Sequence, residues 1–250
     1  MRNYLAAECY KVFHRKYFYL TLLVVLALEG VLMWGYHLTL NWGNPNVDFN
    51  FAAGILATLL VVGLYAPVLT GDMVFSEQYK NGTLKNEVCY GAPRPRVYLG
   101  KLLTAGLVSV LAAAIMLGAY IGGSALLFPA NGQGWSLIAC LLAGAPALWL
   151  AALGVTMAVY FLVRSTNVAA FLTVGILGVL PPILQGLGIL IHPVFEVVRQ
   201  LTPAVVLDNL SAMAAAGRWD YVAQCWAVGL AWLAGSTLIG LLSFRKMEIK

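Results

Sequence analysis

The residues best suited to chemistry are few in this chain of 250 residues, and they are scattered along it. The three histidines show no metal-ligand spacing, and the four cysteines include no Cys-x-x-Cys pair. Gly100-Lys101 resembles the end of a phosphate-binding P-loop, but Leu102 stands where that loop requires Ser or Thr. The sequence therefore predicts no catalytic residue, metal site, disulfide or nucleotide site in this chain, and we expect a protein that is not an enzyme.

One acidic residue is notable for its position. Glu29 lies halfway along an apolar run, where a charge in a membrane costs about 2.5–3.5 kcal/mol on insertion scales. It must therefore be protonated, be paired or face a water-filled cavity. Two alternatives stay open: a structural or solvated role, or a place in a substrate path to which we also assign Tyr65 and Pro181. The second role would suit an ion-coupled secondary transporter or a channel.

The composition indicates that lipid surrounds most of the chain. It is 61% hydrophobic and 10% charged, whereas a soluble domain carries about 25% charged residues. Runs of about 20 apolar residues cross a membrane as helices, because lipid offers the backbone no hydrogen bonds. We predict an all-α integral membrane protein with six spans: about Phe18–Leu40, Phe51–Leu69 with an extension through Phe75, Leu102–Phe128, Ser136–Val163, Val168–Ile191 and Tyr221–Phe244.

Lysine and arginine set the expected orientation. Of the 15 such residues, all but Arg199 and Arg218 fall in the N-terminal segment, the connection between spans two and three, the turn at Arg164, or the tail ending at Lys250. By the positive-inside rule these segments and both termini are cytosolic. As the location we expect a prokaryotic cytoplasmic membrane. The net charge of +5 is thus a sign of topology, and we expect no nucleic-acid partner.

The segments outside the spans have helical patterns of their own. Residues 1–17 predict an amphipathic helix on the cytosolic membrane surface, with Glu8, Lys11 and Arg15 on its polar face. Residues 192–220 predict two short helices that dip into the outer leaflet; the alternative is a lid on the outer surface. Pro181-Pro182 should kink the fifth span.

Small residues recur at four-residue spacing in three of the spans. Such spacing lets helices approach closely. The motifs are Gly118-x-x-x-Gly122, Gly154-x-x-x-Ala158 and Ala231-x-x-x-Gly235. We favour packing within one subunit over a seam between two, and treat residues 1–250 as a single transmembrane domain.

A polar segment, residues 76–101, separates the second and third spans. Gly82 permits a turn, Thr83 can cap the start of a helix, and Gly91 suits its end. Residues 84–90 between them make about two helical turns. A short helix held off the membrane between two spans predicts a docking element for a cytosolic protein.

Several residues of this segment form a pattern that resembles the ATP-binding-cassette (ABC) type-2 transporter permeases. The pattern consists of Glu77, Gly82-Thr83-Leu84, Pro93, Arg96 and Gly100-Lys101. The resemblance covers the whole chain. The chain looks like the family's peptide- or drug-export subunits, with bacteriocin-immunity subunits as an example by analogy. Asn86-Glu87 depart from the pattern, because leucines are expected there.

The resemblance implies a permease subunit that moves an amphipathic peptide, an antibiotic or another hydrophobic compound out of the cell. Its partners would be cytosolic ABC ATPase subunits, which bind the ATP and Mg, and a second permease copy, identical or homologous. The ATPase would contact a coupling helix through Glu77, Gly82, Thr83, Leu84, Glu87, Val88 and Tyr90. Pro93, Arg94, Arg96 and Lys101 would lie at the lipid headgroups, where the chain re-enters the membrane.

Overall fold

The structure is a computed structural model that describes residues 2–44, 46–129, 132–163 and 165–246. All regular elements in those ranges are helices, and six of the helical segments are long and apolar enough to cross a membrane. The prediction of an all-α protein with six membrane-length segments is confirmed. Arg164 and Lys250, which entered the topology argument, lie outside the described residues.

The helix boundaries follow the predicted spans except at the second and the third. The second was predicted as one helix through Phe75, but it breaks between Gly63 and Ala66 and continues to Asn81. The third begins at Arg94 rather than near Leu102, because Pro93 occupies the N-cap position and Pro95 fits the first turn. In chain order the elements are α1 (Arg2–Phe13), α2 (Lys16–Asn41), α3 (Phe49–Gly63), α4 (Ala66–Asn81), α5 (Thr83–Cys89), α6 (Arg94–Leu127), α7 (Gly132–Val163), α8 (Thr166–Val174), the π-helix η1 (Gly175–Val179), α9 (Leu180–Leu190), α10 (Val194–Gln200), α11 (Pro203–Ala215) and α12 (Asp220–Lys246).

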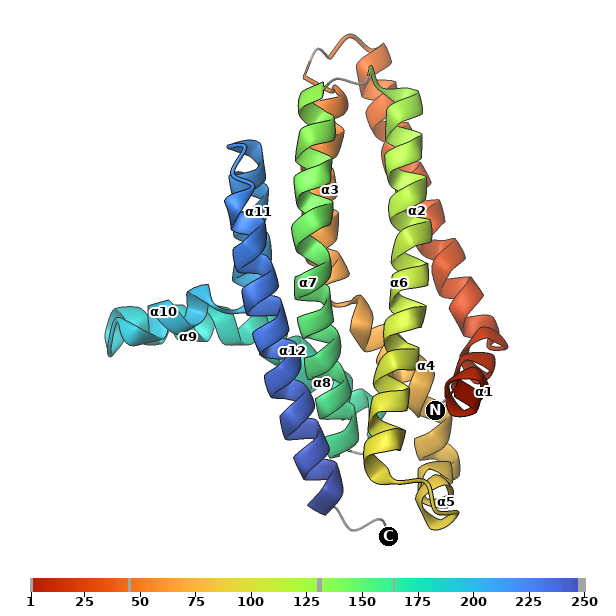
Figure 1. The fold of residues 1–250 in the computed structure, drawn as a ribbon. Helices are drawn as coiled ribbons and strands as arrows, with labels where there is room; N and C mark the ends of the chain where they lie inside the picture. The colour runs from red at the N-terminus through yellow and green to blue at the C-terminus, as the bar shows by residue number, and fades with distance from the viewer. Residues whose placement is uncertain (1, 45, 130–131, 164, 247–250) are drawn as a thin grey trace.

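Long helices run side by side along the molecule, and α1, α5 and the C-terminal end of α12 share its lower part (Figure 1). We call this part the basic end. Helix α7 is the centre of the bundle: 67% of its most apolar window is buried, against 6% for α2. It packs against α3, α4, α8, α11 and α12, so it contacts parts of the second, fifth and sixth spans as well as α11.

The fifth span changes direction partway along. Helix α8 leaves the basic end, η1 follows, and α9 then projects sideways with α10 returning beside it (Figure 1). The turn falls just before Pro181-Pro182, where two residues without backbone N–H groups disturb the helical ladder. The predicted kink is confirmed. The two short helices expected within residues 192–220 are α10 and α11, and their entry into the membrane stays a prediction.

Two apolar clusters hold the bundle together. One fills the half away from the basic end, between α3, α7, α11 and α12. The other, which we call the lower core, lies at the basic end and is rich in aromatic rings. The Phe161 ring of α7 has its centroid 4.9 Å from that of Phe75, 4.6 Å from Tyr98 and 4.7 Å from Phe244. These contacts fix α4, α6, α7 and α12 against one another, directly beside α5.

Helices α7 and α12 approach closely because glycines face the partner helix. A Cβ atom at Gly229 would lie 2.3 Å from the carbonyl oxygen of Ala147, and one at Gly154 would lie 2.5 Å from Ser236 Oγ. The small-residue motif at Gly154 therefore packs within the chain, as expected. At Gly118, Gly122 and Gly235 an added Cβ would have no neighbour within 4 Å, so the other two motifs make no such contact among the described residues.

We expect Gly229→Ala to lower the free energy of unfolding by about 1–3 kcal/mol, because the new methyl group would overlap backbone that cannot move aside. SDS-induced unfolding in mixed micelles measures this. Gly235→Ala, in the same helix but facing open space, is the matched control. Because alanine has the better helix propensity, the free energy of unfolding of this variant should stay unchanged or rise by up to about 1 kcal/mol. Equal effects at both positions would contradict the close packing.

Candidate functional site

Glycines bound the short helix α5. Gly82 has φ +63° and joins the end of α4 to the start of α5, and Gly91 has φ +89° just beyond its end. Residues with side chains rarely adopt this backbone conformation, so both turns depend on glycine. Thr83 is the first residue of the helix and makes no capping hydrogen bond. The predicted capping role of Thr83 is therefore wrong, since Gly82 occupies the N-cap position.

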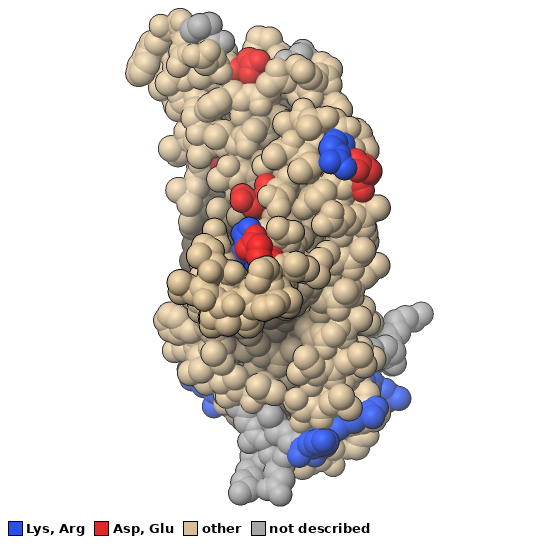
Figure 2. All heavy atoms as spheres, turned by 90° about the vertical axis from the view of Figure 1, so that its left-hand side faces the viewer, with Lys and Arg blue, Asp and Glu red and all other residues tan. Residues whose placement is uncertain are grey.

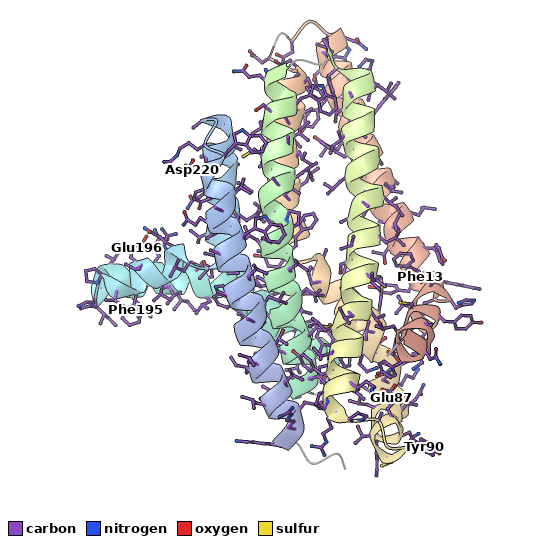
Figure 3. All side chains as sticks on the ribbon, viewed as in Figure 1. Phe13, Glu87, Tyr90, Phe195, Glu196 and Asp220 are labelled. Atoms are coloured by element: carbon purple, nitrogen blue, oxygen red, sulfur yellow. The ribbon has the colours of Figure 1, made fainter. Side chains whose placement is uncertain are left out.

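Helix α5 has two different faces. Leu84 and Val88, one helical turn apart, are partly buried against the lower core. Lys85 and Cys89 are exposed on the other face, and Tyr90, just past the helix, is 90% exposed. Figure 3 shows Tyr90 at the lower tip of the molecule. The apolar pair assigned to ATPase contact thus faces the bundle, and the surface free for a partner is the opposite one.

Glu87, also on α5, ties this helix to three others. Its carboxylate accepts a hydrogen bond from the Tyr4 hydroxyl of α1 at 2.9 Å and one from Gln78 Nε2 of α4 at 3.2 Å. Its oxygens also lie 3.6 Å from Lys11 Nζ and 3.5 Å from Lys101 Nζ. One side chain of α5 therefore contacts α1, α4 and α6 together.

Lys101 is the buried centre of this arrangement. Its side chain is fully buried, and its Nζ lies 2.9 Å from Glu8 Oε2, whose side chain is 3% exposed. Lys11 Nζ lies 2.6 Å from the other Glu8 oxygen. Burying charges is costly unless they are paired and hydrogen-bonded, and here each has an opposite partner. The prediction that Lys101 lies at the lipid headgroups is wrong. We call Tyr4, Glu8, Lys11, Gln78, Glu87 and Lys101 the ion-pair network.

Gly100, next to Lys101, lies at the same contact between α1 and α6. A Cβ atom at this position would come within 2.3 Å of the Tyr4 ring. The missing side chain therefore gives α1 the room to lie against α6, which brings Glu8 to Lys101. Both residues of the Gly100-Lys101 pair thus hold α1 and α6 together, which gives a structural reason for a pair that mimics a P-loop in the sequence.

The network shifts the pKa values of Glu8 and Lys11. Burial alone would raise the pKa of Glu8, but Lys101 and Lys11 outweigh burial and hold that pKa below its usual value. Burial alone would lower the pKa of Lys11, and the Glu8 and Glu87 carboxylates raise it above its usual value. Because the Glu8 pKa is lower in the folded chain, its contribution to stability is present above the unfolded pKa and is lost as the pH falls through the folded one.

Two arginines link neighbouring helices at the periphery of the basic end. Arg15 Nη2 lies 2.8 Å from Glu77 Oε2, which links the α1–α2 junction to α4. Arg94, assigned to the headgroups, instead donates to the backbone carbonyls of Phe244 and Arg245 at the end of α12. Cations are favourable at helix C-termini, where carbonyls lack intrahelical partners. Pro93 and Arg96 are exposed, and their place at the membrane surface stays a prediction.

The sequence analysis missed the inward face of α1. Glu8 was expected on the water-facing side, yet it is 2% exposed, and the apolar Val12 shares its buried side. Tyr4, Glu8 and Lys11 recur every three or four residues, so the stripe itself was visible in the sequence. Its direction was not, because the Glu87 and Lys101 partners lie 83 and 93 positions away in the chain.

The candidate substrate-path residues do not converge on one site. Tyr65 lies at the break between α3 and α4, and an added Cβ at Gly178 of η1 would meet its hydroxyl at 2.8 Å. Two helix breaks, one of them beside Pro181, therefore touch. Glu29 is half-buried on α2, and one of its carboxylate oxygens has no hydrogen-bond partner in the described part of the chain. No hydrogen bond joins Glu29 to Tyr65 or Pro181 among the described residues.

This architecture defines a class of protein: a multi-pass membrane protein of six membrane-length helical segments, with a short polar helix displayed at one end. Sequence comparison is more specific, since residues 4–181 match the family described as ABC-2 family transporter protein. The chain belongs to this family. The match spans α1, α5 and the start of α6, so it contains the whole ion-pair network. A comparison with curated proteins found no match.

Proposed function

We propose that this chain is the permease subunit of an ATP-driven exporter, with ATP and Mg bound by a separate cytosolic ATPase. The observation that carries the proposal is α5. Its outer face and the adjoining Tyr90 are exposed, whereas Glu87 on the inner side contacts α1, α4 and α6 through hydrogen bonds and an ion pair. A helix that is free on one side and tied to three others on the opposite side can pass a displacement from a partner into the bundle.

The charge distribution supports a cytosolic place for the basic end. On the face shown in Figure 2, Lys and Arg side chains gather at the lower end, and the charges higher up include acidic residues. Of the Lys and Arg residues that the structure describes, all but Arg199 and Arg218 lie on α1, at the start of α2, on α4 to the start of α6, or at the end of α12, the segments of this end (Figure 1). By the positive-inside rule this end, with both chain termini, would face the cytosol.

The network suggests how ATP-driven movement reaches the spans. A push on α5 would be transmitted by Glu87 to Lys101 of α6 and to Tyr4 of α1. The bundle could bend at two helix breaks, at Tyr65 and at η1, which lie against each other. For ATP to drive the cycle, the ATPase must bind one of the resulting conformations more tightly than the other.

The cargo we propose is an amphipathic peptide, an antibiotic or another hydrophobic compound, exported between this subunit and a second permease copy, identical or homologous. The apolar surface of the spans fits such a route. Exposed side chains of α2, α6 and α12, including Leu28, Leu107 and Leu238, are large and hydrophobic. They would face lipid or the second copy.

Co-purification tests the proposed function. The tagged chain, solubilised from its native membrane in a mild detergent, should carry an ABC-class ATPase at a fixed ratio, detected by mass spectrometry and by ATP hydrolysis. A tagged multi-pass membrane protein of another family, prepared in the same way, is the control. Recovery of the chain without any such ATPase would overturn the proposal.

A further inference from the structure

An open-sided cavity of about 420 Å³ lies between α3, α7 and α11, in the half of the molecule away from the basic end. Small residues create it: Gly54 and Ala57 on α3 face Ala212 on α11 across the hollow. Its volume lies within the range of about 300–1,000 Å³ that is usual for small-molecule sites. The walls are mostly apolar, so the few polar groups among them determine what would bind.

Three polar side chains line this cavity: Thr58, Asp208 and Ser211. Asp208 is exposed and is the one charged residue of α11. The Ser211 hydroxyl donates to the Asp208 backbone carbonyl at 2.9 Å, so the hydroxyl oxygen keeps its lone pairs free to accept. The cavity therefore offers a full negative charge and hydroxyl acceptors within an apolar hollow, and its described lining includes no positive charge.

The acidic residues of α10 and α12 differ from Asp208, because each is already paired with an arginine. Glu196 on α10 holds Arg199 through two hydrogen bonds of 2.8 and 2.6 Å, and Asp220 at the start of α12 lies 2.6 Å from Arg218. Figure 3 labels both acids on the side of the molecule that carries α10 and α12. The two arginines away from the basic end are thus already paired. Asp208 has no ion-pair partner among the described residues.

We infer that this cavity binds the cationic group of an amphipathic compound, with Asp208 as the counter-ion and the apolar walls holding the rest of the molecule. A carboxylate next to apolar surface attracts an ammonium, phosphonium or guanidinium group strongly and repels anions. The inference rests on the proposed function and narrows its cargo from hydrophobic compounds in general to monovalent cationic ones.

Binding of two probes of the same shape and opposite charge tests the inference. The full chain is purified in a non-ionic maltoside detergent, which supplies no cation, and titrated with tetraphenylphosphonium and with tetraphenylborate. We expect tetraphenylphosphonium to bind and tetraphenylborate to bind at least about tenfold more weakly. Equal binding of the two probes would overturn the inference.

Substitutions in the cavity test whether tetraphenylphosphonium binds there. Asp208→Asn should weaken tetraphenylphosphonium binding at least about tenfold, and Asp208→Glu should restore most of it. Glu196→Gln removes a carboxylate that already has its arginine, so it is the matched control and should change binding less than about twofold. Gly54→Leu, at a position with open space around its Cβ, should fill the cavity and abolish binding without unfolding the chain. Undiminished binding by Asp208→Asn or Gly54→Leu would overturn the inference.

The outcome is separable from that of the proposed function, because the binding assay needs no ATPase. If the ATPase co-purifies but Asp208→Asn binds normally, the cavity assignment fails and the exporter proposal stands. If tetraphenylphosphonium binds through Asp208 but no ATPase co-purifies, the exporter proposal fails and the cationic site stands.

Discussion

Replacing Lys101 with methionine is expected to lower the free energy of unfolding by about 3–5 kcal/mol, the usual effect of removing one partner from a buried ion pair. Methionine has a similar length, so the change removes charge more than volume. Glu8, 2% exposed, and Glu87 would then share Lys11 as their remaining cation in the network. SDS-induced unfolding in mixed micelles measures the change.

The same substitution at Lys85, which is exposed on α5, is the matched control and should alter stability by less than about 0.5 kcal/mol. The double variant Glu8→Gln/Lys101→Met should recover a substantial part of the loss, because it removes the uncompensated carboxylate together with the cation. If Lys101→Met behaves like Lys85→Met, the buried pair does not stabilise this junction.

Helix α5 illustrates what could be predicted from the sequence. Its bounds follow from local chemistry, since Gly82 and Gly91 take backbone conformations that favour glycine, and the seven residues Thr83–Cys89 form a helix between them. Its faces could not be predicted in the same way. Leu84 and Val88 look like a docking stripe in isolation, but the lower core offers them a closer apolar surface. A pattern shows that two residues share a face without showing what that face meets.

The fifth span shows the same limit on a larger scale. Residues Thr166–Leu190 have the length and hydropathy of a membrane-crossing helix, and the prolines predicted a kink. After η1 the chain leaves the direction of α8, α9 lies beside α10, and α11 packs against α7 (Figure 1). Hydropathy measures preference for lipid along the chain, and it carries no information about where a broken helix points.

Charge pairing was the least predictable feature. Lys101 and Arg94 both belong to a basic run that suits lipid headgroups, yet one is buried in the ion-pair network and the other holds the end of α12. Conversely, Asp208 is one acid among several in the sequence. That it has no ion-pair partner among the described residues is clear only from the structure, which pairs Arg199 with Glu196 and Arg218 with Asp220.

Tyr90→Ala is expected to weaken the complex with the ATPase by about 30-fold, the effect of losing an aromatic anchor worth about 2 kcal/mol. Tyr90 is 90% exposed and adjoins the free face of α5, so its ring is available to a partner and contributes little to the fold. The measurement is the affinity of the purified chain for the ATPase recovered with it, together with the free energy of unfolding, which should not change.

Trp42→Ala is the control for Tyr90→Ala, because Trp42 is also an exposed aromatic residue, at 79%, but lies just past the far end of α2. It should leave ATPase affinity unaltered. The pair of tests also separates docking from transmission: Tyr90→Ala should lose the partner and keep its stability, whereas Lys101→Met should lose stability through a residue that no partner can touch. Full ATPase affinity in Tyr90→Ala would show that the partner binds elsewhere, and α5 would then be a structural turn rather than a docking helix.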